Sequence, residues 1–109
     1  MQYAASAQNE LDVTAEVSGV MEVECVIHRT HGAYGGLLGA EIQTPAGLSL
    51  VAQAYSQMDG SDGVSRSMRA KAVFSGVRKG QRYHLAVRRT DGSFANMPSF
   101  SWFVEIRTS

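Results

Sequence analysis

The chain has 109 residues, of which 44% are hydrophobic and 8% aromatic, and its acidic and basic side chains are equal in number. This composition is typical of one globular domain and excludes a disordered chain. The balanced charge gives no global attraction to nucleic acid, and no stretch reaches the ~18 apolar residues of a membrane helix. A single cysteine, Cys25, excludes an intramolecular disulfide. The opening residues lack the basic and apolar segments of a secretory signal, so we expect a soluble protein.

Charge is unevenly distributed along the chain. Residues 1–64 carry eight acidic side chains and one arginine, whereas residues 65–109 carry nine basic and two acidic side chains. Two explanations are open. Acidic and basic strands pair within one molecule, which is the explanation we favour, or the acidic surface of one copy contacts the basic surface of the next.

In chain order, residues 1–10 show little hydrophobic periodicity, and we expect them to form a flexible N-terminal arm. Residues 11–109 are expected to form a single domain, because apolar and polar residues alternate through it with the period of half-buried β-strands. No window shows a convincing helical period. The predicted strands are 11–17, 21–28, 38–42, 48–54, 67–74, 82–88 and 100–107.

Turn-forming residues separate these segments. Thr44–Gly47 places Pro and Gly where a tight turn tolerates them, and the Gly-rich residues 31–36 and the polar residues 59–63 form loops. Asp91-Gly92 is the strongest hairpin signal in the chain. Short strands with regular turns predict an all-β fold, a two-layer antiparallel β-sandwich of about seven to eight strands.

The only close cluster of metal-ligand side chains is Cys25, His28 and His31. Zinc needs about four converging donors, yet residues three apart on a strand point to opposite faces. Asp59 begins a loop that resembles a calcium site but lacks the glutamate that closes one. No arrangement of nucleophile, base and acid is identifiable. We therefore expect no catalytic residues, no metal, no cofactor and no enzymatic activity.

The basic residues of the second half could form a stripe for nucleic acid. Proteins that bind single strands place exposed aromatic side chains among such charges. Here Tyr83, Phe100 and Trp102 fall in the apolar registers of their strands. We therefore expect no nucleic-acid partner. The lack of a long apolar segment likewise predicts no association with a membrane.

Apolar side chains also occupy positions that the alternation places on the outer faces. A sheet covered by a partner would produce this pattern. We expect the following residues to form an oligomer interface: Val51, Tyr55, Val73 and Phe103. Aspartate at Phe103 or Tyr55 should then weaken assembly, because it would bury an unpaired charge.

The segment from Phe74 to Val87 reads F-S-G-V-R-K-G-Q-R-Y-H-L-A-V. It resembles the tyrosine corner of fibronectin-III and immunoglobulin-like domains, which implies that the hydroxyl of Tyr83 bonds the backbone a few residues upstream. It is also similar to the final strands of trimeric jelly-roll domains, found in phage fibre heads, capsid decoration (cement) proteins and the C1q/TNF superfamily. The resemblance covers roughly residues 11–107 and describes a fold.

The resemblance implies a jelly-roll-like sandwich, with a fibronectin-III or immunoglobulin-like topology as the alternative. It further implies a non-enzymatic virion structural protein that decorates a capsid, forms a trimer and binds the capsid or a neighbouring virion protein. Such a protein would lie on the virion surface, and the alternative location is the cytoplasm, as a soluble protein before assembly. Two alternatives remain. One is a receptor- or glycan-binding fibre head with Tyr34, Asp59 and Asp62 in its recognition loops, and the other is a monomeric fibronectin-III-like interaction module.

Overall fold

A computed structural model of the chain describes residues 2–3, 9–30, 37–56, 58–59, 66–89 and 99–108. Among these residues no helix is long and apolar enough to cross a membrane. The secondary structure of these residues consists of ten strands: β1 (Gln2–Tyr3), β2 (Glu10–Thr14), β3 (Gly19–Thr30), β4 (Leu37–Leu38), β5 (Ala40–Ile42), β6 (Ser49–Tyr55), β7 (Met58–Asp59), β8 (Arg66–Val77), β9 (Arg82–Arg89) and β10 (Ser99–Arg107).

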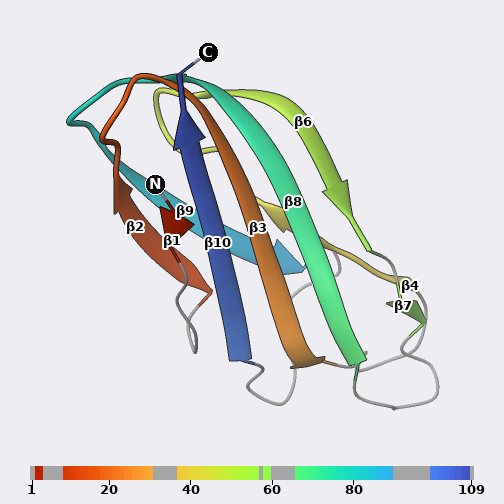
Figure 1. Ribbon diagram of the computed structural model, residues 1–109. Coiled ribbons are helices and arrows are strands. Elements are labelled where there is room, and N and C mark those ends of the chain that lie inside the picture. Colours follow the sequence, from red (N-terminus) through yellow and green to blue (C-terminus); the bar gives the residue numbers. More distant parts are fainter. Residues whose placement is uncertain are drawn as a thin grey trace.

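Two antiparallel sheets form the body of the molecule (Figure 1). The larger sheet has five strands in the order β1-β10-β3-β8-β6, and the smaller has three in the order β2-β9-β5. The pair β4 and β7 forms a separate two-stranded sheet. The predicted all-β, two-layer antiparallel sandwich is therefore confirmed, and the two main sheets together contain eight strands.

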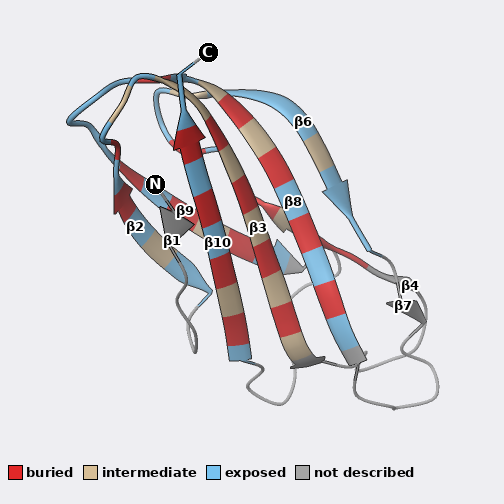
Figure 2. Cartoon of the chain, in the orientation of Figure 1, coloured by how far each residue is buried: buried red, intermediate tan, exposed pale blue. Residues whose placement is uncertain are grey.

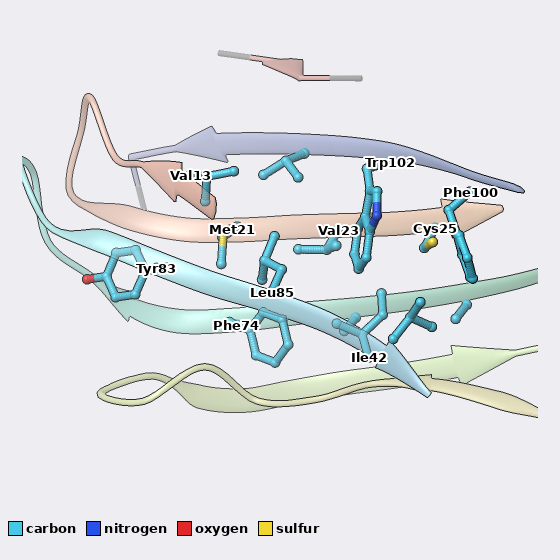
Figure 3. Close-up of a cluster of buried hydrophobic side chains, with 14 of the residues drawn as sticks. Val13, Met21, Val23, Cys25, Ile42, Phe74, Tyr83, Leu85, Phe100 and Trp102 are labelled. Atoms are coloured by element: carbon cyan, nitrogen blue, oxygen red, sulfur yellow. The ribbon is translucent and has the colours of Figure 1, made fainter. Parts of the chain in front are cut away.

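The core lies between the two sheets. Every second side chain is buried over Met21–Ile27 of β3, Met68–Phe74 of β8 and Phe100–Ile106 of β10, which Figure 2 shows as regular bands. The largest core side chains include Trp102, Phe74 and Met21, and Figure 3 shows Phe74, Ile42 and Leu85 in the space between the sheets. The alternation predicted from the sequence for these strands is confirmed, because each buries one face against the opposite sheet.

β6 departs from the predicted alternation. A β-bulge interrupts its pairing with β8 between Leu50 and Ala52. Before the bulge Leu50 lies opposite the buried Phe74, and after it Tyr55 lies opposite the buried Ala70. Residues directly opposite each other in an antiparallel pair share a face. Tyr55 is thus on the core side of β6, not on the outer side where strict alternation placed it.

Asp91-Gly92 was predicted to join two paired strands of a hairpin, and this prediction is wrong. These two residues lie outside the described part of the chain, but the strands on either side are placed. β9 pairs with β2 and β5 in the smaller sheet, whereas β10 pairs with β1 and β3 in the larger one. The connection between them therefore crosses from one sheet to the other.

The N-terminal residues contain a short strand. Gln2 and Tyr3 pair with Glu105 and Val104 at the edge of the larger sheet. Residues 4–8 lie outside the described part of the chain, and β2 begins at Glu10. The predicted flexibility of residues 1–10 stays a prediction.

Tyr83 connects the two sheets at the turn between β8 and β9. Its buried hydroxyl accepts a hydrogen bond of 2.8 Å from the backbone N–H of Arg78, five residues upstream. This is the contact that the resemblance to a tyrosine corner implies. The turn itself contains Gly80 in the left-handed region (φ 84°), and the Gly80 N–H donates to the carbonyl of Ala15.

Replacement of Tyr83 by phenylalanine should lower the free energy of unfolding by about 1–2 kcal/mol, because the half-buried N–H of Arg78 loses its acceptor. Urea denaturation of the two proteins measures this difference. A change below about 0.3 kcal/mol would show that water replaces the hydroxyl without cost.

Candidate assembly surface

The outer face of the larger sheet combines charged and apolar side chains in cross-strand rows. Phe103 of β10 lies opposite Glu24 of β3, which lies opposite Lys71 of β8. In the neighbouring row Glu22 of β3 lies opposite Val73 of β8. An open hollow of about 360 Å³ follows these rows, and its lining includes Phe103, Val73 and these charged side chains.

The four residues predicted to form an interface fall into two groups. Val73 is half-buried and Phe103 is 40% exposed, and both line the hollow on the outer face. Val51 and Tyr55 lie on β6, at the edge of the sheet, with exposures of 62% and 44%. Val73 lies on β8, which pairs directly with β6, whereas Phe103 on β10 is separated from β6 by β3 and β8. The interface itself stays a prediction.

Sequence reasoning missed Leu50, which is 44% exposed on β6. In the predicted strand 48–54 it shares the inward register with Leu48, Ala52 and Ala54. Leu50 does face the core side of the sheet, opposite Phe74, but β6 is the last strand of the larger sheet and remains largely uncovered. The uncharged run Ser49–Tyr55 was a usable signal, because edge strands normally carry charges.

Ion pairs within the molecule neutralise much of the uneven charge of the sequence. On the smaller sheet Arg88 contacts Glu41 at 2.6 Å, and on the larger sheet Arg107 contacts Glu22 at 2.6 Å. Glu24 contacts both Lys71 at 3.3 Å and Arg69 at 3.6 Å. Among the described side chains these pairs join an acid of the first half to a base of the second. Pairing within one molecule, the explanation favoured from sequence, is therefore present.

His84 lies between two carboxylates on the outer face of the smaller sheet. Its Nδ1 is 2.8 Å from Asp12 and its Nε2 is 3.3 Å from Glu10, while Arg82 contacts Asp12 at 3.0 Å. Hydrogen bonds to Asp12 and then Glu10 raise the pKa of His84. The hydrogen bond from His84, followed by that from Arg82, lowers the pKa of Asp12. A contact whose strength depends on pH therefore joins β2, which carries Glu10 and Asp12, to β9, which carries His84.

The raised pKa of His84 makes the stability of the protein depend on pH. Because the pKa of His84 is higher in the folded state, its contribution to stability is fully present below the unfolded value near 6.5 and is lost as pH rises through the folded value. His84→Gln should therefore lower the melting temperature more at about pH 5.5 than at about pH 8. Thermal unfolding at both pH values measures this, and an equal loss at both would contradict the assignment.

Cys25 and His28 lie on opposite faces of β3, as the spacing predicts. Cys25 is fully buried, and burial followed by the charge of Glu24 raises the pKa of its thiol to about 12. His28 is half-buried on the outer side and contacts the hydroxyl of Ser101 at 3.0 Å. His31 lies outside the described residues, within which no group of three metal-ligating side chains occurs.

Two of the three predicted recognition-loop residues, Tyr34 and Asp62, lie outside the described part of the chain. Asp59 lies in β7, where its backbone is paired with Leu37 of β4. The structure therefore places one of the three, and recognition by these loops stays a prediction.

Comparison with known proteins identifies the fold family. Residues 2–105 match the family model for the jelly-roll domain of major structural protein 1. A chain in the structure of the tripod (BppUct-A-L) from the baseplate of bacteriophage Tuc2009 superposes with a TM-score of 0.73 and 27% sequence identity. That match covers 97% of this chain and 64% of the other, so this chain spans less than two thirds of its structural neighbour. No curated protein is significantly similar in sequence.

These matches decide between the two topologies left open by the sequence, in favour of the jelly roll. They also support the resemblance to phage jelly-roll domains that the segment around Tyr83 indicated. With a family model matched over nearly its whole length, the chain belongs to the family of the jelly-roll domain of major structural protein 1 and is a phage-type jelly-roll domain.

Proposed function

We propose that the chain is a self-associating structural subunit of a phage tail baseplate. The observation that carries this proposal is the similarity to a chain of a baseplate tripod over 97% of the present sequence. This similarity favours the baseplate over the capsid surface that the sequence resemblance suggested. The proposal keeps the expected trimer and the expected lack of enzymatic activity.

The surface of the domain supports a role in assembly. Its large exposed apolar side chains lie on the outer face and the edge of a single sheet, where they are available to a protein partner. Charges on the same sheet are mostly paired within the molecule, so burying them against a partner would not leave them without counter-ions.

Immunogold electron microscopy of particles of the phage that encodes the chain tests the location. Antibodies raised against the purified domain should label the distal end of the tail. Label on the capsid would contradict the baseplate proposal and favour a decoration protein. A phage with an unrelated baseplate is the matched control and should show no label.

The glycan-binding alternative stays a prediction. It would require the loops that contain Tyr34 and Asp62. A glycan array probed with the purified chain, with and without calcium, tests it. A hit that disappears in Tyr34→Ala would support recognition by these loops, whereas an array without hits would count against it.

A further inference from the structure

We propose that copies of this chain assemble head to tail, with the Phe103 patch of one copy against the β6 edge of the next. The Phe103 patch consists of Phe103 and Glu105 of β10 with the hollow that surrounds them. The β6 edge consists of Leu50, Val51 and Tyr55 with the adjacent Arg69 of β8. This inference deepens the proposed self-association and rests on it, because it assigns the two surfaces that meet.

The β6 edge has the properties of a strand that is covered in an assembly. β6 is the last strand of the five-stranded sheet, so one side of its backbone has no strand partner among the described residues. Ser49–Tyr55 contains neither charge nor proline, the residues that usually protect an edge. Three of the four large exposed hydrophobic side chains in the described chain lie on it, namely Leu50, Val51 and Tyr55. Figure 2 shows the strand as largely exposed along its length.

The Phe103 patch has the fourth large exposed hydrophobic side chain and a carboxylate, that of Glu105, which forms no salt bridge with the other described side chains. Glu105 lies directly opposite Glu22 in the register of β10 and β3. Like charges opposite each other destabilise a sheet. Arg107 contacts Glu22 at 2.6 Å and interacts with Glu105 only at longer range, and Glu105 forms no salt bridge with the other described side chains. A second cation, supplied by a neighbouring copy, would reduce the remaining repulsion.

The β6 edge provides both a place for an aromatic ring and such a cation. A second hollow of about 190 Å³ lies between β6 and β8, lined by Ala54, Tyr55, Ser56, Arg69 and Lys71. Most of its exposed lining is apolar, and the side chain of Arg69 is 58% exposed. The apolar ring of Phe103 from one copy suits the apolar lining of this hollow in the next copy. Glu105, two residues further along β10, would then face Arg69 of that next copy. The two surfaces are complementary in charge and in polarity.

The same charges argue against a two-fold contact between identical patches. If Phe103 met Phe103 across a two-fold axis, Glu22, Glu24 and Glu105 of both copies would approach one another. Phe103 and Glu105 lie on β10, and β3 and β8 lie between this strand and β6. The hollows beside the two patches share only Lys71 as a lining residue. Because the patches are different surfaces, their contact is heterologous. A heterologous contact repeated around an axis closes a ring, and a trimer is one such ring.

Charge reversal with rescue tests the contact. Glu105→Arg and Arg69→Glu should each raise the dissociation constant of the assembly at least about tenfold, because each places like charges across the contact. The double variant, with both charges reversed in the same chain, should restore assembly toward the wild-type value. Glu16→Arg and Lys79→Glu are the matched controls, since they make the same charge changes between β2 and β3 and in the β8–β9 turn. Sedimentation equilibrium at several concentrations measures each constant.

The outcomes separate this inference from the proposal on which it rests. A wild-type protein that assembles, with single variants that assemble equally well, would overturn the head-to-tail contact and leave self-association standing. A double variant as weak as the singles would also overturn the contact. A wild-type protein that stays monomeric would overturn the contact and self-association together, while the location in the baseplate is tested separately by immunogold labelling.

Covalent capture gives a second readout that does not depend on charge. In a chain carrying Glu105→Cys and Arg69→Cys, an added oxidant should link neighbouring copies into disulfide-bonded multimers, resolved by non-reducing electrophoresis. Within one chain these positions are on β10 and β8 with β3 between them, too far apart for a disulfide. The buried Cys25, with its raised pKa, should not compete. Monomers alone after oxidation of the assembled protein would contradict the contact.

Discussion

Replacement of Phe74 by alanine should lower the free energy of unfolding by about 3–5 kcal/mol. Phe74 is completely buried in β8, an inner strand of the larger sheet, and its ring fills the space between the two sheets near Ile42 and Leu85 (Figure 3). Its removal leaves a cavity between the two sheets, and the loss of packing around it adds to the lost burial. Because small domains are stable by only about 5–15 kcal/mol, the loss is a large part of the total.

Urea denaturation with a spectroscopic readout measures the effect. Gln43→Ala, at an exposed position next to β5, is the control and should change the free energy by less than about 0.5 kcal/mol. A loss below about 1.5 kcal/mol for Phe74→Ala would mean that the two sheets collapse around the cavity and that the core is less rigid than the structure indicates.

Replacement of Phe103 by aspartate should weaken assembly at least about tenfold and leave the fold of the single copy intact. Phe103 is 40% exposed on the outer face, so the isolated copy loses little burial when the ring is removed. In an assembly the new carboxylate would replace the ring in the mostly apolar hollow of the next copy, where it would lose its hydration, and it would add a third negative charge beside Glu105 and Glu24.

The assembly constant from sedimentation, together with a circular dichroism melt, separates these two effects. Tyr55→Asp tests the other surface in the same way, and Gln81→Asp in the β8–β9 turn controls for the added charge. If both Phe103→Asp and Tyr55→Asp assemble like the wild type, these residues are not in the interface.

The parts of the fold that follow from local alternation could be predicted from the sequence. β3, β8 and β10 are buried on one face only, so the period of their apolar residues records the core directly. The relation of Tyr83 to the backbone upstream could be predicted as well, because the residues involved are only five apart.

Features that depend on distant strands could not be predicted. Asp91-Gly92 has the residues of a tight turn, but a turn signal cannot say that β9 and β10 belong to different sheets. The bulge at Val51 changes which side chains of β6 face the core, and nothing in the local residues marks it. The exposure of Leu50 results from the position of β6 at the end of the sheet, which is a property of the whole topology.

The candidate assembly surface was predicted in part. Val51, Tyr55, Val73 and Phe103 were selected as apolar residues in outward positions, but two strands, β3 and β8, lie between β6 and the strand of Phe103. The sequence could not predict that Val51 and Tyr55 lie at an edge of the sheet and Val73 and Phe103 on its outer face, because this depends on the strand order. The repulsion between Glu105 and Glu22 could not be predicted without the strand register, because only the pairing of β10 with β3 places these two residues opposite each other.

The mass of the purified chain in solution tests the central claim most directly. Light scattering at several concentrations and salt levels should give a stable oligomer, with a trimer near three times the 11.8 kDa of one chain. Dissociation at high salt would agree with the proposed contact between Glu105 and Arg69, because salt screens exposed charges. A monomer at every concentration and salt level would contradict a self-associating subunit.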